Sequence, residues 1–89
     1  MQLTKIDIEI LHALYSCNMI TEMQSYRVSD ILDVLVCKPA YYTISKHIRK
    51  LLIPLGYINE GMRDSRANTY YITDAGITYL HSIGVISNE

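Results

Sequence analysis

The sequence predicts an α+β fold, with elements in the order helix-strand-helix-helix-strand-strand-helix, in a single domain over residues 1–89. Apolar residues recur at helical spacing in several segments. Residues 57–61 and 69–73 are typical of two hairpin strands, because a polar and basic loop separates them. The composition is that of a globular protein, since 49% of the residues are hydrophobic and 19% are charged.

The first helix is predicted over residues 5–17. Thr4 can cap it, and Asp7 lies close to the positive end of the helix dipole. A short strand is expected at residues 26–28. The apolar stripe of the first helix consists of Leu3, Ile6, Ile10, Leu11 and Leu14.

The second helix is expected to start at a Ser29 cap, with Asp30 in its first turn, and to stop before Pro39. The third helix has Pro39 near its start. Pro54 is expected to disturb its last turn, and Gly56 to end it in a left-handed conformation. Its buried stripe is predicted to be Ile44, Ile48, Leu51, Leu52 and Leu55.

The last helix is predicted to follow the second hairpin strand directly. Thr73 or Asp74 would cap it, and Ile77 and Leu80 would face the core. The helix is expected to run up to Gly84.

Charge is distributed unevenly along the chain, although the net charge is only −1. Residues 1–37 carry −3, residues 38–66 carry +4 and residues 67–89 carry −2. Six of the eight basic residues therefore belong to the middle third. A polarised molecule of this kind can dock a polyanion on its basic part.

Several classes of function are not expected. No apolar run approaches the length of about 18 residues that spans a membrane, and no secretion signal is recognisable, so we expect a cytoplasmic protein. Cys17 and Cys37 are expected to be reduced thiols, with a redox switch as the less favoured alternative. The histidines lack metal-ligand spacing, and no catalytic set or phosphate loop is present, so neither a cofactor nor an enzymatic activity is predicted.

Two motifs resemble the winged helix-turn-helix transcription regulators, a group that includes MarR-like, PadR-like and ArsR-like repressors. Residues 42–51 (YTISKHIRKL), followed by Leu55-Gly56-Tyr57-Ile58, resemble their recognition helix and first wing strand. Residues 70–76 (YYITDAG), followed by Tyr79-Leu80, resemble the second wing strand and the start of the next helix. The resemblance implies a sequence-specific regulator of double-stranded DNA. Because no activation segment is visible, we expect it to act as a repressor by occlusion.

In that fold the third helix enters the major groove, and its first residues meet base edges. Arg and Lys can donate to guanine, while Ser and Thr can contact bases or phosphates. His47 either touches a phosphate or packs at the edge of the helix. Arg63 and Arg66, in the wing at residues 62–68, would reach the backbone or the minor groove. The complete set of expected contacts is Lys38, Tyr41, Tyr42, Thr43, Ser45, Lys46, His47, Arg49, Lys50, Arg63 and Arg66.

One recognition helix covers few base pairs, so a homodimer with half-sites roughly 34 Å apart is expected. The first and last helices would form its interface. Two other functions stay open: a winged-helix module that binds proteins, and a plasmid or phage architectural or segregation protein that coats repeated DNA sites. The apolar residues expected at the dimer interface are Ile8, Ile77, Ile83, Val85 and Ile86.

Overall fold

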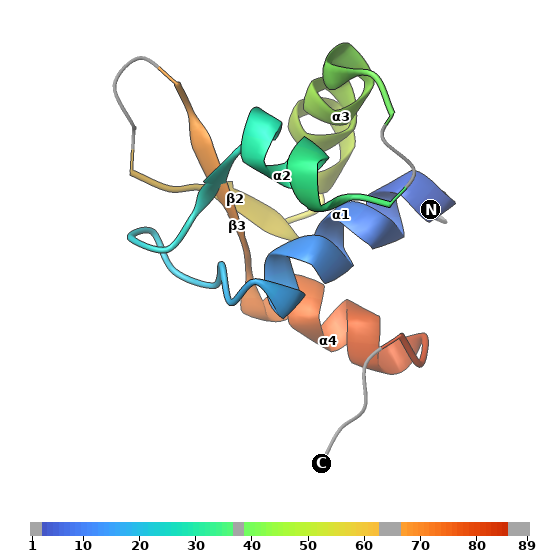
Figure 1. The fold of residues 1–89 in the computed structure, drawn as a ribbon. Coiled ribbons are helices and arrows are strands. Elements are labelled where there is room, and N and C mark those ends of the chain that lie inside the picture. The colour runs from blue at the N-terminus through green and yellow to red at the C-terminus, as the bar shows by residue number, and fades with distance from the viewer. Residues whose placement is uncertain (1–2, 37–38, 63–66, 86–89) are drawn as a thin grey trace.

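A computed structural model describes residues 3–36, 39–62 and 67–85 (Figure 1). The predicted α+β order is confirmed, with one added π-helical turn, η1, after the third helix. The elements are α1 (Lys5–Ser16), β1 (Tyr26–Arg27), α2 (Val28–Val34), α3 (Tyr41–His47), η1 (Ile48–Leu52), β2 (Ile58–Glu60), β3 (Thr69–Ile72) and α4 (Asp74–Ser82).

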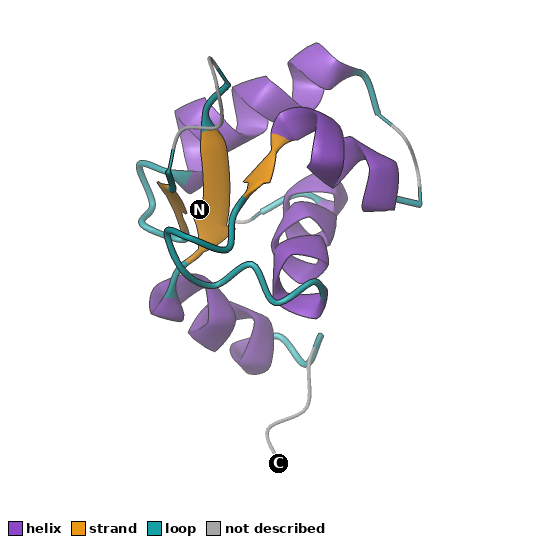
Figure 2. Ribbon diagram, turned by 60° about the vertical axis from the view of Figure 1, so that its left-hand side comes forward, coloured by secondary structure: helices purple, strands orange, loops and turns teal. Residues whose placement is uncertain are grey.

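The three strands form an antiparallel sheet in the order β1-β3-β2. β2 and β3 are the predicted hairpin, with Ile58 opposite Ile72. β1 pairs on the other edge of β3, where Tyr26 lies opposite Tyr70. Figure 2 shows the strands side by side and α4 at the end of the molecule away from α3.

The core lies where α1 meets the other helices and the inner face of the sheet. α1 lies between α3 and α4 (Figure 1), and Leu11 and Leu14 on it have no solvent exposure. Ile31 of α2 and Leu80 of α4 are likewise 0% exposed. The core therefore fixes both helices of the helix-turn-helix pair, α2 and α3, against α1.

The α1 helix begins as predicted. Thr4 is its N-cap, and the Asp7 carboxylate accepts hydrogen bonds from the Thr4 backbone N–H at 2.9 Å and the Thr4 hydroxyl at 2.8 Å. In return, the Asp7 backbone N–H donates to the Thr4 hydroxyl at 3.5 Å, which completes a capping box. At the other end, Asn18 has a φ of 63°, the left-handed conformation that ends helices.

The predicted Ser29 cap of α2 is wrong. The helix begins two residues earlier than a Ser29 cap requires, at Val28, with Arg27 as its N-cap. The Asp30 side chain accepts a hydrogen bond from the Arg27 backbone N–H at 3.2 Å, so an acid at the third helical position satisfies the first donor. Ser29 is therefore an exposed residue inside the first turn.

The stripe predicted for the third helix holds for Ile44, Ile48 and Leu52, which are 0% exposed, but not for Leu55, which is 38% exposed. In a regular α-helix the ring of Pro54 would clash with the carbonyl four residues earlier. The chain widens into η1 just before Pro54, and Leu55 falls in the turn that follows. Gly56 has a φ of 83°, as predicted for the residue that ends the helix.

α4 starts at the predicted Thr73 cap, whose hydroxyl accepts a hydrogen bond from the Gly76 N–H at 3.2 Å. Of the apolar residues expected at a dimer interface, Ile8 and Ile77 are partly buried against the core of the same chain. Ile83 and Val85 are 42% and 38% exposed. Ile86 lies outside the described residues.

Candidate nucleic-acid interface

The α3–η1 helix has one face toward the core and one toward solvent. The inner face is closed by the three apolar residues of the buried stripe. Tyr41 and Tyr42 on the outer side are 59% and 71% exposed, whereas Thr43 and Ser45 are half-buried. The exposed side chains of the outer face are Tyr41, Tyr42, Lys46, Arg49 and Lys50.

Two hollows adjoin on this face, and Ser45 and Arg49 line both of them. The first, about 310 Å³, lies along the helix and is also lined by Tyr42, Lys46 and Lys50. With three cations and no carboxylate among the described residues that line it, this hollow is suited to polyanionic ligands. The second hollow, which we call the Tyr70 pocket, faces the sheet and measures about 290 Å³.

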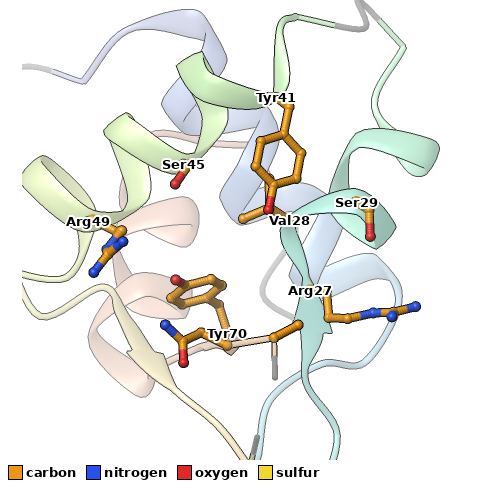
Figure 3. A pocket seen from close by; sticks show the side chains of 9 residues that line it. Arg27, Val28, Ser29, Tyr41, Ser45, Arg49 and Tyr70 are labelled. Atoms are coloured by element: carbon orange, nitrogen blue, oxygen red, sulfur yellow. The ribbon is translucent and has the colours of Figure 1, made fainter. Parts of the chain in front are cut away.

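The Tyr70 pocket includes residues that the sequence did not identify as a site, namely Arg27, Asn68 and Tyr70 (Figure 3). Its other polar side chains are Ser29, Tyr41, Ser45 and Arg49. The pairing of β1 with β3 brings Arg27 close to Tyr70, 43 positions later in the chain. Asn68 and Tyr70 are two positions apart, just before and within β3. Because side chains alternate between the faces of a strand, this spacing alone indicated that they share a face.

The base of the wing, the loop of residues 62–68 that joins β2 to β3, is held in place by polar contacts. The Ser25 hydroxyl donates to the Thr69 hydroxyl at 2.8 Å, and Thr69 in turn donates to the Met62 carbonyl. Gly61 lies so close to this point that an added Cβ would stand 2.4 Å from the Ser25 Oγ. These contacts tie Met62 and Thr69 together where β2 and β3 meet the loop.

His47 faces α1 with one of its ring nitrogens. Its Nδ1 lies 2.6 Å from the Asp7 Oδ1, and because a carboxylate only accepts, the Nδ1–H donates. The imidazole is 26% exposed, whereas the carboxylate is fully buried. Of the two roles expected for His47, packing at the helix edge is the one that this geometry displays. A phosphate contact through its other nitrogen stays a prediction.

Three of the expected DNA contacts, Lys38, Arg63 and Arg66, lie outside the described residues. Cys37 lies outside them as well, while Cys17 is a half-buried free thiol. A hydrogen bond with Cys17 raises the pKa of the Tyr26 hydroxyl, and burial adds to this effect.

Two features are absent from the parts of the chain that the structure describes. No helix in them is both long and apolar enough to span a bilayer. No group of three or more His, Cys, Asp or Glu side chains in them could hold a metal ion.

The fold matches two solved structures closely. TubR from Bacillus megaterium pBM400 superimposes with a TM-score of 0.77 and 21% sequence identity, covering 93% of this chain and 89% of that one. The DNA-binding TubR fragment from Clostridium botulinum gives a TM-score of 0.71 and 30% identity, covering 93% of this chain and 99% of the fragment. No protein-family model and no curated protein sequence matches the chain. These likenesses bear out the predicted winged-helix fold but not a MarR-like, PadR-like or ArsR-like subfamily.

Proposed function

This chain belongs to the TubR family, and we propose that it binds double-stranded DNA through the outer face of α3–η1 and the adjoining wing. The observation that carries the proposal is the outer face itself, on which Lys46, Arg49 and Lys50 surround one hollow. Cations in this arrangement neutralise phosphates, the main source of affinity for duplex DNA. The DNA-binding TubR fragment of similar fold supports the same conclusion.

Among the DNA-binding roles that the sequence left open, we favour the segregation protein over the transcriptional repressor. Kinship with TubR proteins supports this choice. The two roles differ physically, since a repressor acting by occlusion needs one occupied operator, whereas a segregation complex needs many copies on adjacent repeated sites. The surface proposed here acts by binding alone, without catalysis.

The proposed assembly is a homodimer that uses α1 and α4. Ile83 and Val85, just beyond the end of α4, support this interface, because both are apolar and more than a third exposed. Two recognition helices related by a two-fold axis would fit half-sites about one helical turn apart. Sedimentation of the full chain across a concentration range measures the oligomeric state directly, and a monomer at all concentrations contradicts the dimer.

Selection from a random duplex library, followed by binding measurements against salt, tests the function. A steep salt dependence, with a slope of roughly −5 or steeper, is expected for a dimer that contacts several phosphates. The selected site is then placed in one, two and four copies. A rise in affinity per site with copy number indicates segregation, whereas equal affinity per site at all copy numbers indicates a repressor.

Charge-removing variants separate this function from that of a protein-binding module. Lys46→Ala and Arg49→Ala are expected to weaken DNA binding, because both residues line the hollow of the outer face. Lys5→Ala is the matched control, since Lys5 is an exposed cation on α1. Equal affinity of all three variants and the wild type, or no binding to any duplex at low salt, would redirect the search to a protein partner.

A further inference from the structure

We propose that the Tyr70 pocket is a seat for one phosphodiester of the DNA backbone, with the Tyr70 hydroxyl and the Arg49 guanidinium as its donors. This inference rests on the proposed DNA-binding function and names a contact within it. It adds Tyr70, a strand residue, to a surface otherwise supplied by α3 and the wing tip. It also gives Arg49 a phosphate rather than a base as its partner.

The chemistry of the pocket selects an anion. Hydroxyls of Tyr41, Ser45 and Tyr70, the Asn68 amide and two arginines line it, and none of the described residues that line it carries a carboxylate. Such a set can donate several hydrogen bonds to one group of clustered oxygens. A volume of about 290 Å³ lies at the lower limit for sites of small molecules, about 300–1,000 Å³, and suits a single group of a larger ligand.

Arg49 and Tyr70 face each other across this pocket. Figure 3 shows the Tyr70 ring lying in the pocket with its hydroxyl toward the Arg49 side, while the Arg27 side chain extends away on the other side. Arg27 forms an ion pair there with Asp30 at 3.3 Å. Arg49 is therefore the cation best placed to act together with the Tyr70 hydroxyl.

The Tyr70 side chain is held as a protonated donor. The residue is only 3% exposed, so its ring is fixed by packing. Burial raises the pKa of the hydroxyl, with smaller upward contributions from Glu60 and Tyr41, while Arg49 and a hydrogen bond with Asn68 lower it. Since the raised pKa keeps the phenol protonated at neutral pH, its hydroxyl can donate a hydrogen bond to an anionic ligand.

The position of the pocket suits a backbone contact. It shares Ser45 and Arg49 with the hollow along α3, so a duplex held against that helix passes directly over it. Base edges lie deep inside a DNA groove and cannot enter a partly enclosed pocket on the protein. Phosphates lie at the outside of the duplex and can. The pocket thus sets the position of the duplex relative to the sheet.

The variant Tyr70→Phe removes the donor and keeps the buried ring. We expect about a tenfold loss of affinity for every duplex, as for one hydrogen bond to a charged group, with an unchanged salt slope because no charge is lost. Arg49→Gln is expected to weaken binding and also to flatten the slope by about 0.9. Tyr71→Phe, the neighbouring strand residue, is the matched control for hydroxyl removal.

Neutral methylphosphonates placed one at a time along the selected duplex identify the partner. At one position in each half-site, the loss caused by Tyr70→Phe should disappear, because the variant and the neutral phosphate remove the same bond. Additive losses at every position, with the wild type binding normally, overturn the phosphate seat and leave the proposed function intact. A wild type that binds no duplex overturns both.

A soluble anion is the remaining source of the same chemistry. Titration of the full chain with inorganic phosphate, followed by the amide resonances of Asn68 and Tyr70, distinguishes it. Weak shifts that appear only at high phosphate concentration support a seat that needs the rest of the duplex. Tight binding of free phosphate that depends on Tyr70, with additive losses on DNA, assigns the pocket to a small-molecule anion and overturns the proposal.

Discussion

On its inner face the α3–η1 helix holds Ile44, Ile48 and Leu52 without solvent exposure, whereas Tyr41 and Tyr42 on its outer face are 59% and 71% exposed. The inner face meets α1 and the core, and the outer face carries the cations of the proposed DNA surface. The same turns of helix thus combine a rigid support with a solvated ligand surface. Substitutions on the two faces should therefore change different quantities, one the free energy of unfolding and the other the affinity for DNA.

The sharpest test of the inner face is Ile48→Ala. Truncating a residue with 0% exposure leaves a cavity, so the free energy of unfolding should fall by about 2–5 kcal/mol. Urea unfolding followed by far-UV circular dichroism measures this change. DNA affinity, corrected for the folded fraction, should stay near that of the wild type. The milder Ile48→Val should cost about 0.5–1.5 kcal/mol, and an equal small loss for both variants would contradict tight packing here.

His47 lies between the two faces, so its substitution tests whether it stabilises the fold, binds DNA or does both. His47→Ala leaves the fully buried Asp7 carboxylate without one of its donors, although both bonds from Thr4 remain. The expected loss in the free energy of unfolding is about 1–3 kcal/mol. If the salt slope of DNA binding also falls, His47 contacts a phosphate as well. A variant as stable as the wild type would show that the Asp7 contact contributes little.

On the outer face, Lys46→Ala should leave the free energy of unfolding within about 0.5 kcal/mol of the wild type, because the side chain is exposed. Affinity should fall similarly for all duplexes, and the salt slope should flatten by about one unit. Fluorescence anisotropy at several salt concentrations measures both. A loss confined to one base sequence would instead assign Lys46 to a base edge.

The inner face could be predicted from the sequence, and much of the outer face could not. Ile44, Ile48 and Leu52 follow from helical periodicity, and the Thr73 cap and the left-handed Gly56 follow from local backbone chemistry. These features depend on residues a few positions apart. The wrong Ser29 cap shows the limit, because the Asp30 side chain accepts a hydrogen bond from the Arg27 backbone N–H, and the helix begins at Val28 instead.

Contacts between distant segments account for what sequence reasoning missed. The partner of His47 is Asp7, 40 positions earlier, and nothing local to either residue indicates the pair. Tyr70 entered the site only through the pairing of β3 with β1 and the packing of α3 above it. The strongest sequence signal for function was the clustering of cations in residues 38–66, which locates a surface but not the pockets within it.

Tyr70 of β3 combines the two roles in one side chain, since its ring is buried and its hydroxyl lines a pocket, so it offers the finest test of the comparison. Burial raises its pKa above the ordinary 10.0, so the unfolded phenol loses its proton at lower pH than the folded one. The corresponding stability is complete below about pH 10 and is lost as the pH rises through the folded pKa. The midpoint temperature of thermal unfolding of Tyr70→Phe should therefore fall less steeply with pH above pH 10 than that of the wild type. If the midpoint temperatures of both proteins fall equally with pH above pH 10, water reaches the hydroxyl freely. Tyr70 would then be part of the ligand surface and not of the core.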